Sequence, residues 1–131
     1  MTATAEDRTW SIGELADELG VTTRTLRFYE AEGLISPERR GTSRLYRPRE
    51  HARMRLILRG RRFGMTLAEI GEIVGMYDGA ATSERRQLET LLARLGEIRA
   101  DLHERQSDLA RLLREVETVG DQCETRLREL T

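Results

Sequence analysis

The spacing of apolar residues predicts short helices at the start of the chain. Ser11 precedes "IGELADELG", in which apolar residues recur at helical spacing and Glu14 stands three residues after the serine. This is the pattern of a capping box that opens an amphipathic helix. Thr22 or Thr23 can then cap a second helix that runs to about Glu32. Two short helices joined by a glycine-containing turn indicate a helix-turn-helix.

The second predicted helix has one apolar and one basic face. We expect Leu26, with Phe28 or Tyr29, to face the first helix, and helical phase favours Phe28 as the core aromatic. Arg24 and Arg27 stand three residues apart and therefore share the other face.

The segment that follows, "ISPERRGTSRLYRP" at 35–48, is bracketed by prolines and turn-rich at 41–43. It predicts a short β-hairpin, or wing, with its arginines pointing outward. A helix is expected over 49–62 and is broken by "FGMT". Thr66 then caps another amphipathic helix over 67–77.

Residues 78–83, "DGAATS", are small and flexible and form the predicted linker. From Ser83 onward apolar residues follow in steps of three and four, and Arg105 occupies the one polar position in the series. About five heptads of this kind are typical of a coiled coil. Gly120 is expected to loosen this helix, and "ETRLREL" to fold back as a terminal turn. The apolar series consists of Leu88, Leu91, Leu95, Ile98, Leu102, Leu109, Leu112, Val116, Val119 and Cys123.

A helix of roughly 37 residues spans about 55 Å, which exceeds the width of a domain of about 80 residues. Packing on its own domain is therefore the weaker alternative, and a second copy is the predicted partner, giving a two-fold symmetric dimer. The predicted organisation is a disordered tail at 1–9, a DNA-binding domain at 10–78, and the linker with the dimerisation helix at 79–131.

Charge changes this picture more than composition does. The net charge of −1 hides a basic first half, because residues 1–65 carry 13 Arg against 9 acidic residues. Between Arg39 and Arg62, ten arginines face a single acid, Glu50. Such a basic patch favours a polyanionic partner, and nucleic acid is the expected one. A merely solvated charged face is the alternative.

The chain shows no apolar run of the roughly 20 residues that a membrane span needs. Its first residues also lack the apolar stretch of a signal peptide. Cys123 is the single cysteine, which excludes an internal disulfide. We therefore expect a cytoplasmic protein without membrane association.

The strings "SIGELADELGVTTRTLRFYEAEGLISPERRGTSRLYRP" and "RLILRGRRFGMTLAEIGEIV" resemble the MerR family of bacterial transcription regulators over residues 10–78. "RFYE", "SPERRG" and "LILRGRRFGMTLAEI" are most similar to its subgroup controlling branched-chain amino acid and fatty-acid breakdown genes. The resemblance implies a mainly α fold: a winged helix-turn-helix, then a long helix that forms an antiparallel coiled-coil dimer.

The resemblance also implies the partners and the contacts. The homodimer would bind a pseudo-palindromic promoter site, and its activated form would distort the DNA so that RNA polymerase can use the promoter. A plain repressor released by an effector such as an acyl-CoA is the alternative. The implied DNA-contacting residues are Thr23, Arg24, Arg27, Tyr29, Arg39, Arg40, Arg44, Tyr46, Arg61 and Arg62.

We predict no catalytic site, no cofactor and no metal. The chain has neither a nucleophile turn nor a Gly-rich phosphate loop. Cys123 falls on the apolar series, where its ordinary role is that of a small buried hydrophobe. A thiol site shared between subunits, with His103, stays the alternative. A coiled-coil adaptor with a basic head is the third class, and it would not need the helix-turn-helix and wing strings.

Overall fold

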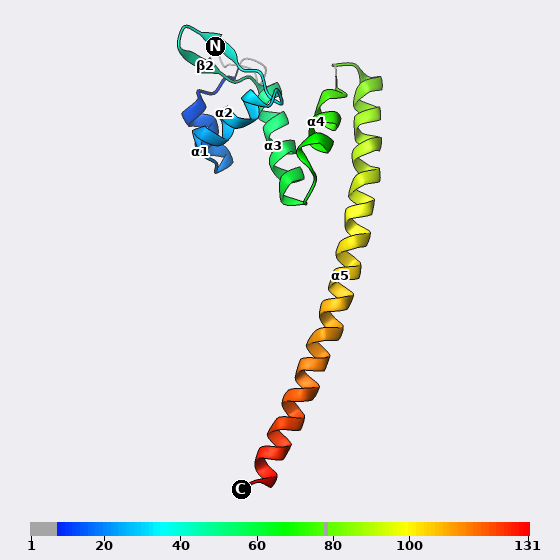
Figure 1. Ribbon diagram of the computed structural model, residues 1–131. Coiled ribbons are helices and arrows are strands. Elements are labelled where there is room, and N and C mark those ends of the chain that lie inside the picture. The colour runs from blue at the N-terminus through cyan, green and yellow to red at the C-terminus, as the bar shows by residue number, and fades with distance from the viewer. Residues whose placement is uncertain (1–7, 78) are drawn as a thin grey trace. The chain divides into compact units, whose positions relative to one another are not determined.

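The computed structural model describes residues 8–77 and 79–131 and divides into two units, Met1–Glu89 and Thr90–Thr131. Most of the tail expected to be disordered, residues 1–7, and Asp78 of the expected linker lie outside the described residues. The chain is mainly helical, as predicted. Its elements are α1 (Ile12–Leu19), α2 (Thr23–Ala31), β1 (Glu38–Arg40), β2 (Ser43–Leu45), α3 (Pro48–Arg62), α4 (Leu67–Gly75) and α5 (Ala81–Glu129) (Figure 1).

Side-chain caps fix where the short helices begin. The Glu14 backbone amide donates to Ser11 Oγ at 3.1 Å, and the Ser11 amide donates to Glu14 Oε1 at 2.9 Å, which confirms the capping box. Thr22 and Thr66 cap α2 and α4, and each accepts from the amide three residues on at 3.1 Å. Gly20 ends α1 with φ 70°, a conformation that side chains disfavour.

The core lies where α1 packs on α2 and α3 packs on α4, and α3 stands between the α1–α2 pair and α4 (Figure 1). A Cβ at Gly60 would lie 2.9 Å from the Ile70 side chain, so glycine lets α3 and α4 approach closely. The buried apolar residues are Trp10, Leu15, Ala16, Leu26, Tyr29, Leu34, Ile35, Tyr46, Met54, Ile57, Met65, Ile70, Ile73 and Val74.

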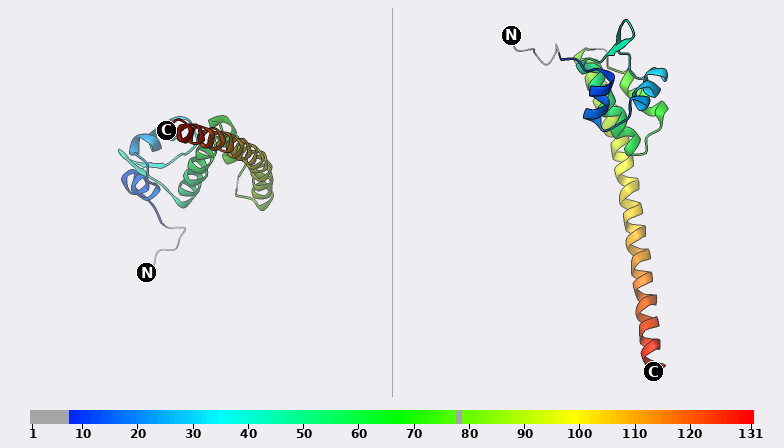
Figure 2. Two further views of the ribbon diagram at one scale, coloured as in Figure 1. Left: turned by 90° about the horizontal axis from the view of Figure 1, so that it is seen from below. Right: turned by 90° about the vertical axis from the view of Figure 1, so that its left-hand side faces the viewer.

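The predicted hairpin is present between α2 and α3. β1 and β2 pair antiparallel, with Arg39 opposite Arg44, and the hairpin projects from the edge of the N-terminal unit (Figure 2). Its base is tied down by Trp10 and Tyr46, whose backbones exchange two hydrogen bonds of 2.8 Å. This pairing fixes where the hairpin leaves the core.

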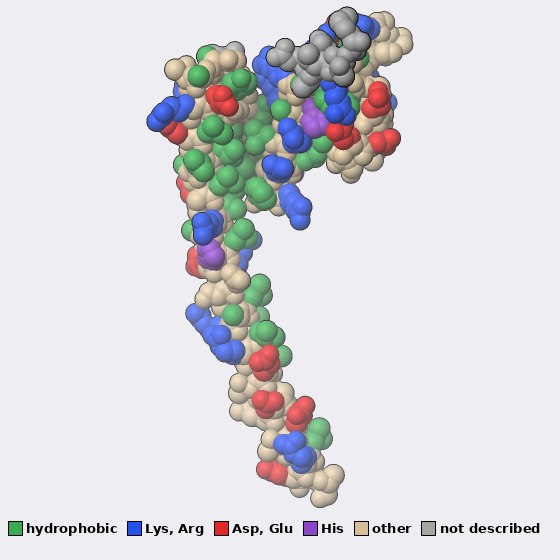
Figure 3. All heavy atoms as spheres, turned by 180° about the vertical axis from the view of Figure 1, so that it is seen from behind, with side chains coloured by type: hydrophobic (Ala, Val, Ile, Leu, Met, Phe, Trp, Pro, Cys, Tyr) green, Lys and Arg blue, Asp and Glu red, His purple; other side chains and the backbone are tan. Residues whose placement is uncertain are grey.

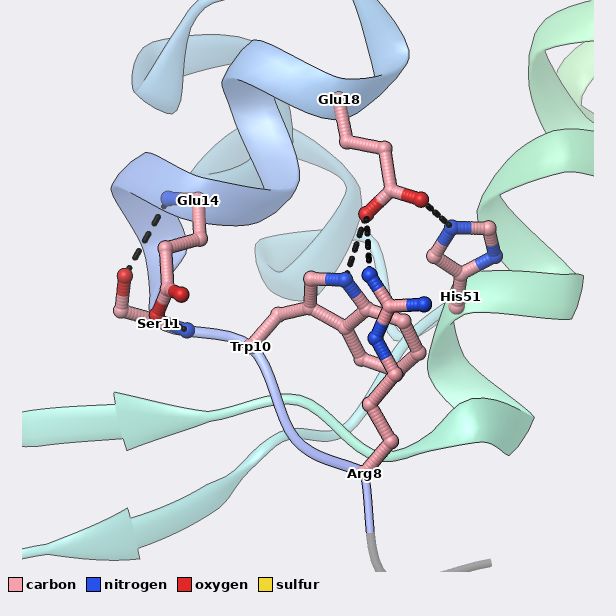
Figure 4. A network of polar contacts seen from close by, with 6 residues as sticks. All are labelled: Arg8, Trp10, Ser11, Glu14, Glu18 and His51. Atoms are coloured by element: carbon pink, nitrogen blue, oxygen red, sulfur yellow. Dashed lines mark hydrogen bonds and ion pairs between the residues drawn. The ribbon is translucent and has the colours of Figure 1, made fainter. Parts of the chain in front are cut away.

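The Glu18 carboxylate of α1 holds Arg8 and Trp10 beside His51 of α3 (Figure 4). It accepts a hydrogen bond from the Trp10 indole at 2.5 Å, and it lies 3.7 Å from the Arg8 guanidinium and 3.3 Å from His51 Nε2. The Trp10 ring also packs on the His51 ring, with 4.6 Å between their centroids. Three separate segments therefore meet at one acid.

Helix α5 differs from the prediction at both ends. It begins at Ala81, inside the expected linker, and runs unbroken through Gly120 to Glu129. The predicted terminal turn is therefore wrong. α4 likewise ends at Gly75 rather than at Tyr77. A single glycine costs about 1 kcal/mol relative to alanine, too little to break a 49-residue helix that is hydrogen-bonded on both sides of it.

The C-terminal unit is formed by α5 from Thr90 onward, and no side chain of α5 is buried. Hydrophobic side chains recur along the helix and stay exposed, among them Leu102, Leu109, Leu112 and Val116 (Figure 3). At the polar position of the series, Arg105 pairs with Asp101 at 2.9 Å. Within residues 8–77 and 79–131, no helix has the length and apolar character needed to cross a bilayer.

Candidate nucleic-acid interface

Helix α2 presents a basic face with one aromatic residue. Arg24 and Arg27 are exposed, as predicted, and Thr23 at the first helical position is half-buried. The prediction for the aromatics is wrong: Phe28 is 50% exposed, whereas Tyr29 is 7% exposed and lies in the core. Tyr29 stands three residues after the buried Leu26 and so shares its face, while Phe28 does not. The phase of Leu26 was the signal that could have placed both.

One carboxylate joins this helix to the hairpin. Glu30 Oε1 accepts from Arg39 Nη2 and Glu30 Oε2 accepts from Arg44 Nε, both at 2.7 Å. The Glu30 side chain is only 16% exposed, and that of Arg44 is 21% exposed. The expectation that all hairpin arginines point outward is therefore wrong for Arg44, which lies against α2.

The electrostatics of Glu30 follow from this position. Partial burial by itself would raise the pKa of its carboxyl group, but the hydrogen bonds from Arg44 and Arg39 outweigh burial. The net result is a pKa below the ordinary value of 4.5. Glu30 therefore stays ionised at neutral pH and partly neutralises the two arginines that it holds.

Tyr46 belongs to the core and not to the exposed surface. Its side chain is fully buried and that of Tyr29 is 7% exposed, so both rings pack in the core, and the predicted DNA contacts of these two residues stay predictions. Burial raises the pKa of the Tyr46 hydroxyl, and the negative charge of Glu30 adds to the effect. The nearby positive charges that oppose this rise come from Arg44, Arg27 and Arg39. Arg27 of α2 thus lies in the same electrostatic neighbourhood as the hairpin.

The rest of the hairpin surface is rich in arginine. Arg40 is well exposed, 3.7 Å from Glu38, and Arg47 donates a hydrogen bond to the same carboxylate. Arg47 was absent from the predicted site residues. Its position just after the hairpin, at the start of α3, is the sequence signal that could have included it.

Arg61 and Arg62 form a second basic position. Both are exposed in the last turn of α3, next to the exposed Phe63, and Arg61 donates to the Met65 carbonyl at 3.3 Å. The 15 residues of α3 span about 22 Å, so these arginines lie well away from the hairpin that precedes the helix. Among the described residues, the guanidinium groups paired with Glu30 are those of Arg39 and Arg44, not those of Arg61 and Arg62.

A capped two-helix unit with an exposed basic second helix and an arginine-rich wing defines a winged helix-turn-helix protein, a DNA-binding class. The comparisons then place it more narrowly. Models of the MerR HTH family regulatory protein and of the MerR DNA-binding region match residues 10–76 and 51–119. The chain belongs to the MerR family and is a DNA-binding transcriptional regulator, not an enzyme.

Named relatives agree with this assignment. The chain is 32% identical over 114 residues to the mercuric resistance operon regulatory protein of Bacillus cereus, covering 86% of this chain and 83% of the relative. It is 31% identical over 109 residues to the transcriptional regulator CueR of Escherichia coli, covering 79% and 78%. A crystal structure of a Listeria monocytogenes protein assigned to the MerR family has the same fold, with a TM-score of 0.78 at 20% identity over 92% of this chain and 93% of that one.

Cys123, the candidate thiol, is exposed on α5 in the single chain. Among the described residues, no three His, Cys, Asp or Glu side chains gather closely enough to hold a metal ion.

The lowered pKa of Glu30 gives a prediction for stability against pH. A carboxyl with a depressed folded-state pKa stabilises the fold above its unfolded pKa, and this contribution disappears as the pH falls through the folded pKa. Glu30→Gln should therefore unfold at lower denaturant concentration than the parent at pH 7, and the difference should shrink steadily below about pH 4.5. Urea unfolding followed by circular dichroism from pH 7 to pH 3 measures this difference.

Glu32→Gln is the matched control, because Glu32 is exposed at the end of the same helix. It should leave the pH profile of the parent unchanged. A difference between parent and Glu30→Gln that is the same at pH 7 and pH 3 would show that the ion pairs do not stabilise the hairpin.

Proposed function

We propose that the protein binds a pseudo-palindromic promoter site as a homodimer, with α2 in the major groove and the hairpin and the end of α3 on the flanking backbone. The observation that carries the proposal is Glu30, which holds Arg39 and Arg44 of the hairpin against the helix that presents Arg24 and Arg27. A basic helix and a basic wing held together in this way suit a duplex, which offers a groove and two phosphate strands within one footprint.

The residues have different roles in this proposal. Arg24, near the start of α2, is the candidate for bidentate hydrogen bonds to a guanine edge, and Thr23 and Phe28 offer nearby polar and apolar contacts. Arg27, Arg39, Arg40 and Arg44 are candidates for phosphate contacts. Arg61 and Arg62 are candidates for the second wing. Phosphate contacts supply affinity, whereas base contacts supply sequence discrimination.

The dimer is supported by the apolar series on α5. Within a single chain the side chains of the series are exposed from Leu102 onward. A helix of 49 residues that leaves such a stripe uncovered exposes apolar surface at a cost of about 25 cal/mol per Å². A second α5, antiparallel and related by two-fold symmetry, would cover it with the same stripe. Cys123 would lie at the end of that interface as a small apolar residue.

The regulatory part of the proposal rests on the family. We propose an effector-responsive regulator that distorts its promoter and so acts indirectly on RNA polymerase, with release of a plain repressor as the competing outcome. The strings "RFYE", "SPERRG" and "LILRGRRFGMTLAEI" support the subgroup that controls branched-chain amino acid and fatty-acid breakdown genes. A dimer would carry two DNA-binding domains linked through their long helices. Bending DNA costs of order 1–6 kcal/mol, and the backbone contacts of two such domains would offset that cost.

The proposed roles predict different defects for two arginine variants. Arg24→Ala should lose about 1–3 kcal/mol of discrimination between the gene's own upstream region and a random duplex. Arg61→Ala should weaken binding to both duplexes alike and lower the slope of log affinity against log salt by about one. Fluorescence anisotropy with both duplexes across a salt series measures both quantities.

Arg114→Ala, an exposed arginine of α5 on the side opposite the apolar series, is the control and should bind like the parent. Equal weakening on both duplexes by Arg24→Ala would remove α2 from the role of base reader.

Truncating leucine side chains of the proposed interface tests the dimer. Leu102→Ala and Leu109→Ala should each cost about 2–5 kcal/mol per buried side chain, because each leaves a cavity at a covered position. Together they should raise the dimer dissociation constant by at least about a hundredfold in sedimentation equilibrium, while Arg114→Ala leaves it unchanged. An unaltered dimer in the double leucine variant would place the interface elsewhere.

A further inference from the structure

A cavity of about 390 Å³ lies between α3, α4 and the first turns of α5, within the N-terminal unit. Such a volume falls in the range of small-molecule sites, roughly 300–1,000 Å³. The Gln87 side chain holds the start of α5 against α4, because its Nε2 donates to the Ile73 carbonyl at 2.9 Å. The residues that line the cavity are Arg49, Ala52, Arg53, Leu56, Val74, Tyr77, Glu84 and Gln87.

The lining has an apolar part and a cationic end. Leu56, Val74 and the Tyr77 ring supply apolar surface, and Figure 3 shows hydrophobic side chains gathered on the N-terminal unit beside arginine side chains. Arg49 and Arg53 stand four residues apart and so lie on one side of α3. The cavity therefore offers an apolar wall next to two guanidinium groups.

The two arginines lack a counter-ion of their own. Among the described residues, neither the Arg49 nor the Arg53 side chain forms a hydrogen bond or an ion pair, although the arginines of the hairpin are paired with acids. Burial lowers the pKa of the half-buried Arg53, the neighbouring Arg49 lowers it further, and Glu50 opposes them. The Glu50 carboxylate is itself engaged, accepting from the Ser36 amide at 3.0 Å. Among the described residues of the lining, Glu84 is the one carboxylate beside the two guanidinium groups, so the described lining carries more positive than negative charge.

We propose that this cavity binds a small organic anion, an acid group with a hydrocarbon body, whose head pairs with Arg49 and Arg53 and whose body covers Leu56, Val74 and Tyr77. A carboxylate or phosphate head satisfies the uncompensated guanidinium groups through charge-assisted hydrogen bonds. The hydrocarbon body removes the apolar wall from water. This inference supplies a site for the effector of the proposed function, but the binding itself does not require DNA.

The site has a direct structural link to the proposed DNA surface. Arg49 and Arg53 belong to the same helix as Arg61 and Arg62, and α3 is a single rigid element of 15 residues. A ligand that draws α3 toward α4 and α5 would move the basic end of that helix as well. Ligand binding at one end of α3 and DNA binding at its other end can therefore be measured separately.

The test uses octanoate as the probe, with the full chain and without DNA, in isothermal titration calorimetry. We expect saturable binding of octanoate, binding of octanamide weaker by about tenfold or more because it lacks the charge, and weaker binding of acetate because it lacks the tail. Octyl phosphate in place of octanoate distinguishes the two acid heads, and tighter binding of either supports an anion site.

The variants place the site. Arg53→Gln and Arg49→Gln should each weaken octanoate binding by about tenfold. Ala52→Trp, at an exposed position of the lining, should block the cavity without disturbing the core. Arg55→Gln is the matched control on α3, since Arg55 is exposed and does not line the cavity, and it should bind like the parent.

Three results would overturn the proposal: no saturable binding, equal binding of octanoate and octanamide, or octanoate binding that survives both Arg53→Gln and Ala52→Trp. Absence of saturable binding to the full chain would show that the cavity takes no such ligand in the protein as it exists in solution. A normal DNA-binding profile alongside that absence would leave the proposed function intact, because the DNA measurements use Arg24 and Arg61 instead.

Discussion

The bond between Glu30 and two arginines is the constraint on which the candidate DNA surface depends. A helix that presents arginines and a hairpin that presents more of them repel each other, and two strands of three residues each are too short to hold a wing in place. Glu30 counters that repulsion from inside α2. Each guanidinium has five N–H donors, so Arg39 and Arg44 can bond to Glu30 and still offer donors to a phosphate.

The hairpin also depends on Tyr46 and Trp10. Their backbone pairing closes the base of the wing, and the buried Tyr46 ring anchors it to the core while Glu30 orients its arginines. The aromatic anchor, Tyr46, and the paired arginine, Arg44, are two positions apart: Arg44 lies in β2, and Tyr46 directly follows that strand. A wing anchored at its base and tied along one side has a defined position before any nucleic acid is present, which lowers the ordering cost of binding.

Local signals in the sequence predicted the helix starts, because the caps at Ser11, Thr22 and Thr66 involve residues only three apart. The long helix was also predictable from its apolar series, although its C-terminal end was not. Gly120 and the polar residues after it resemble a helix end, but the long run of backbone hydrogen bonds continues through them. The backbone of Tyr46 pairs with that of Trp10, 36 positions earlier, and no local pattern predicts this contact. The cavity lined by Arg49 and Arg53 forms only when three helices come together in space. The charge pattern along the chain therefore identified these arginines only as part of a basic patch.

The central claim is that two copies of this chain read one duplex. Sedimentation velocity of the chain with a duplex carrying the complete promoter site, and with one carrying a single half-site, tests it most directly. The account predicts two chains on the complete site and affinity for the half-site lower by about a hundredfold or more, since the second head binds at high effective concentration. One chain bound to the complete site, with the same affinity for the half-site, would contradict it.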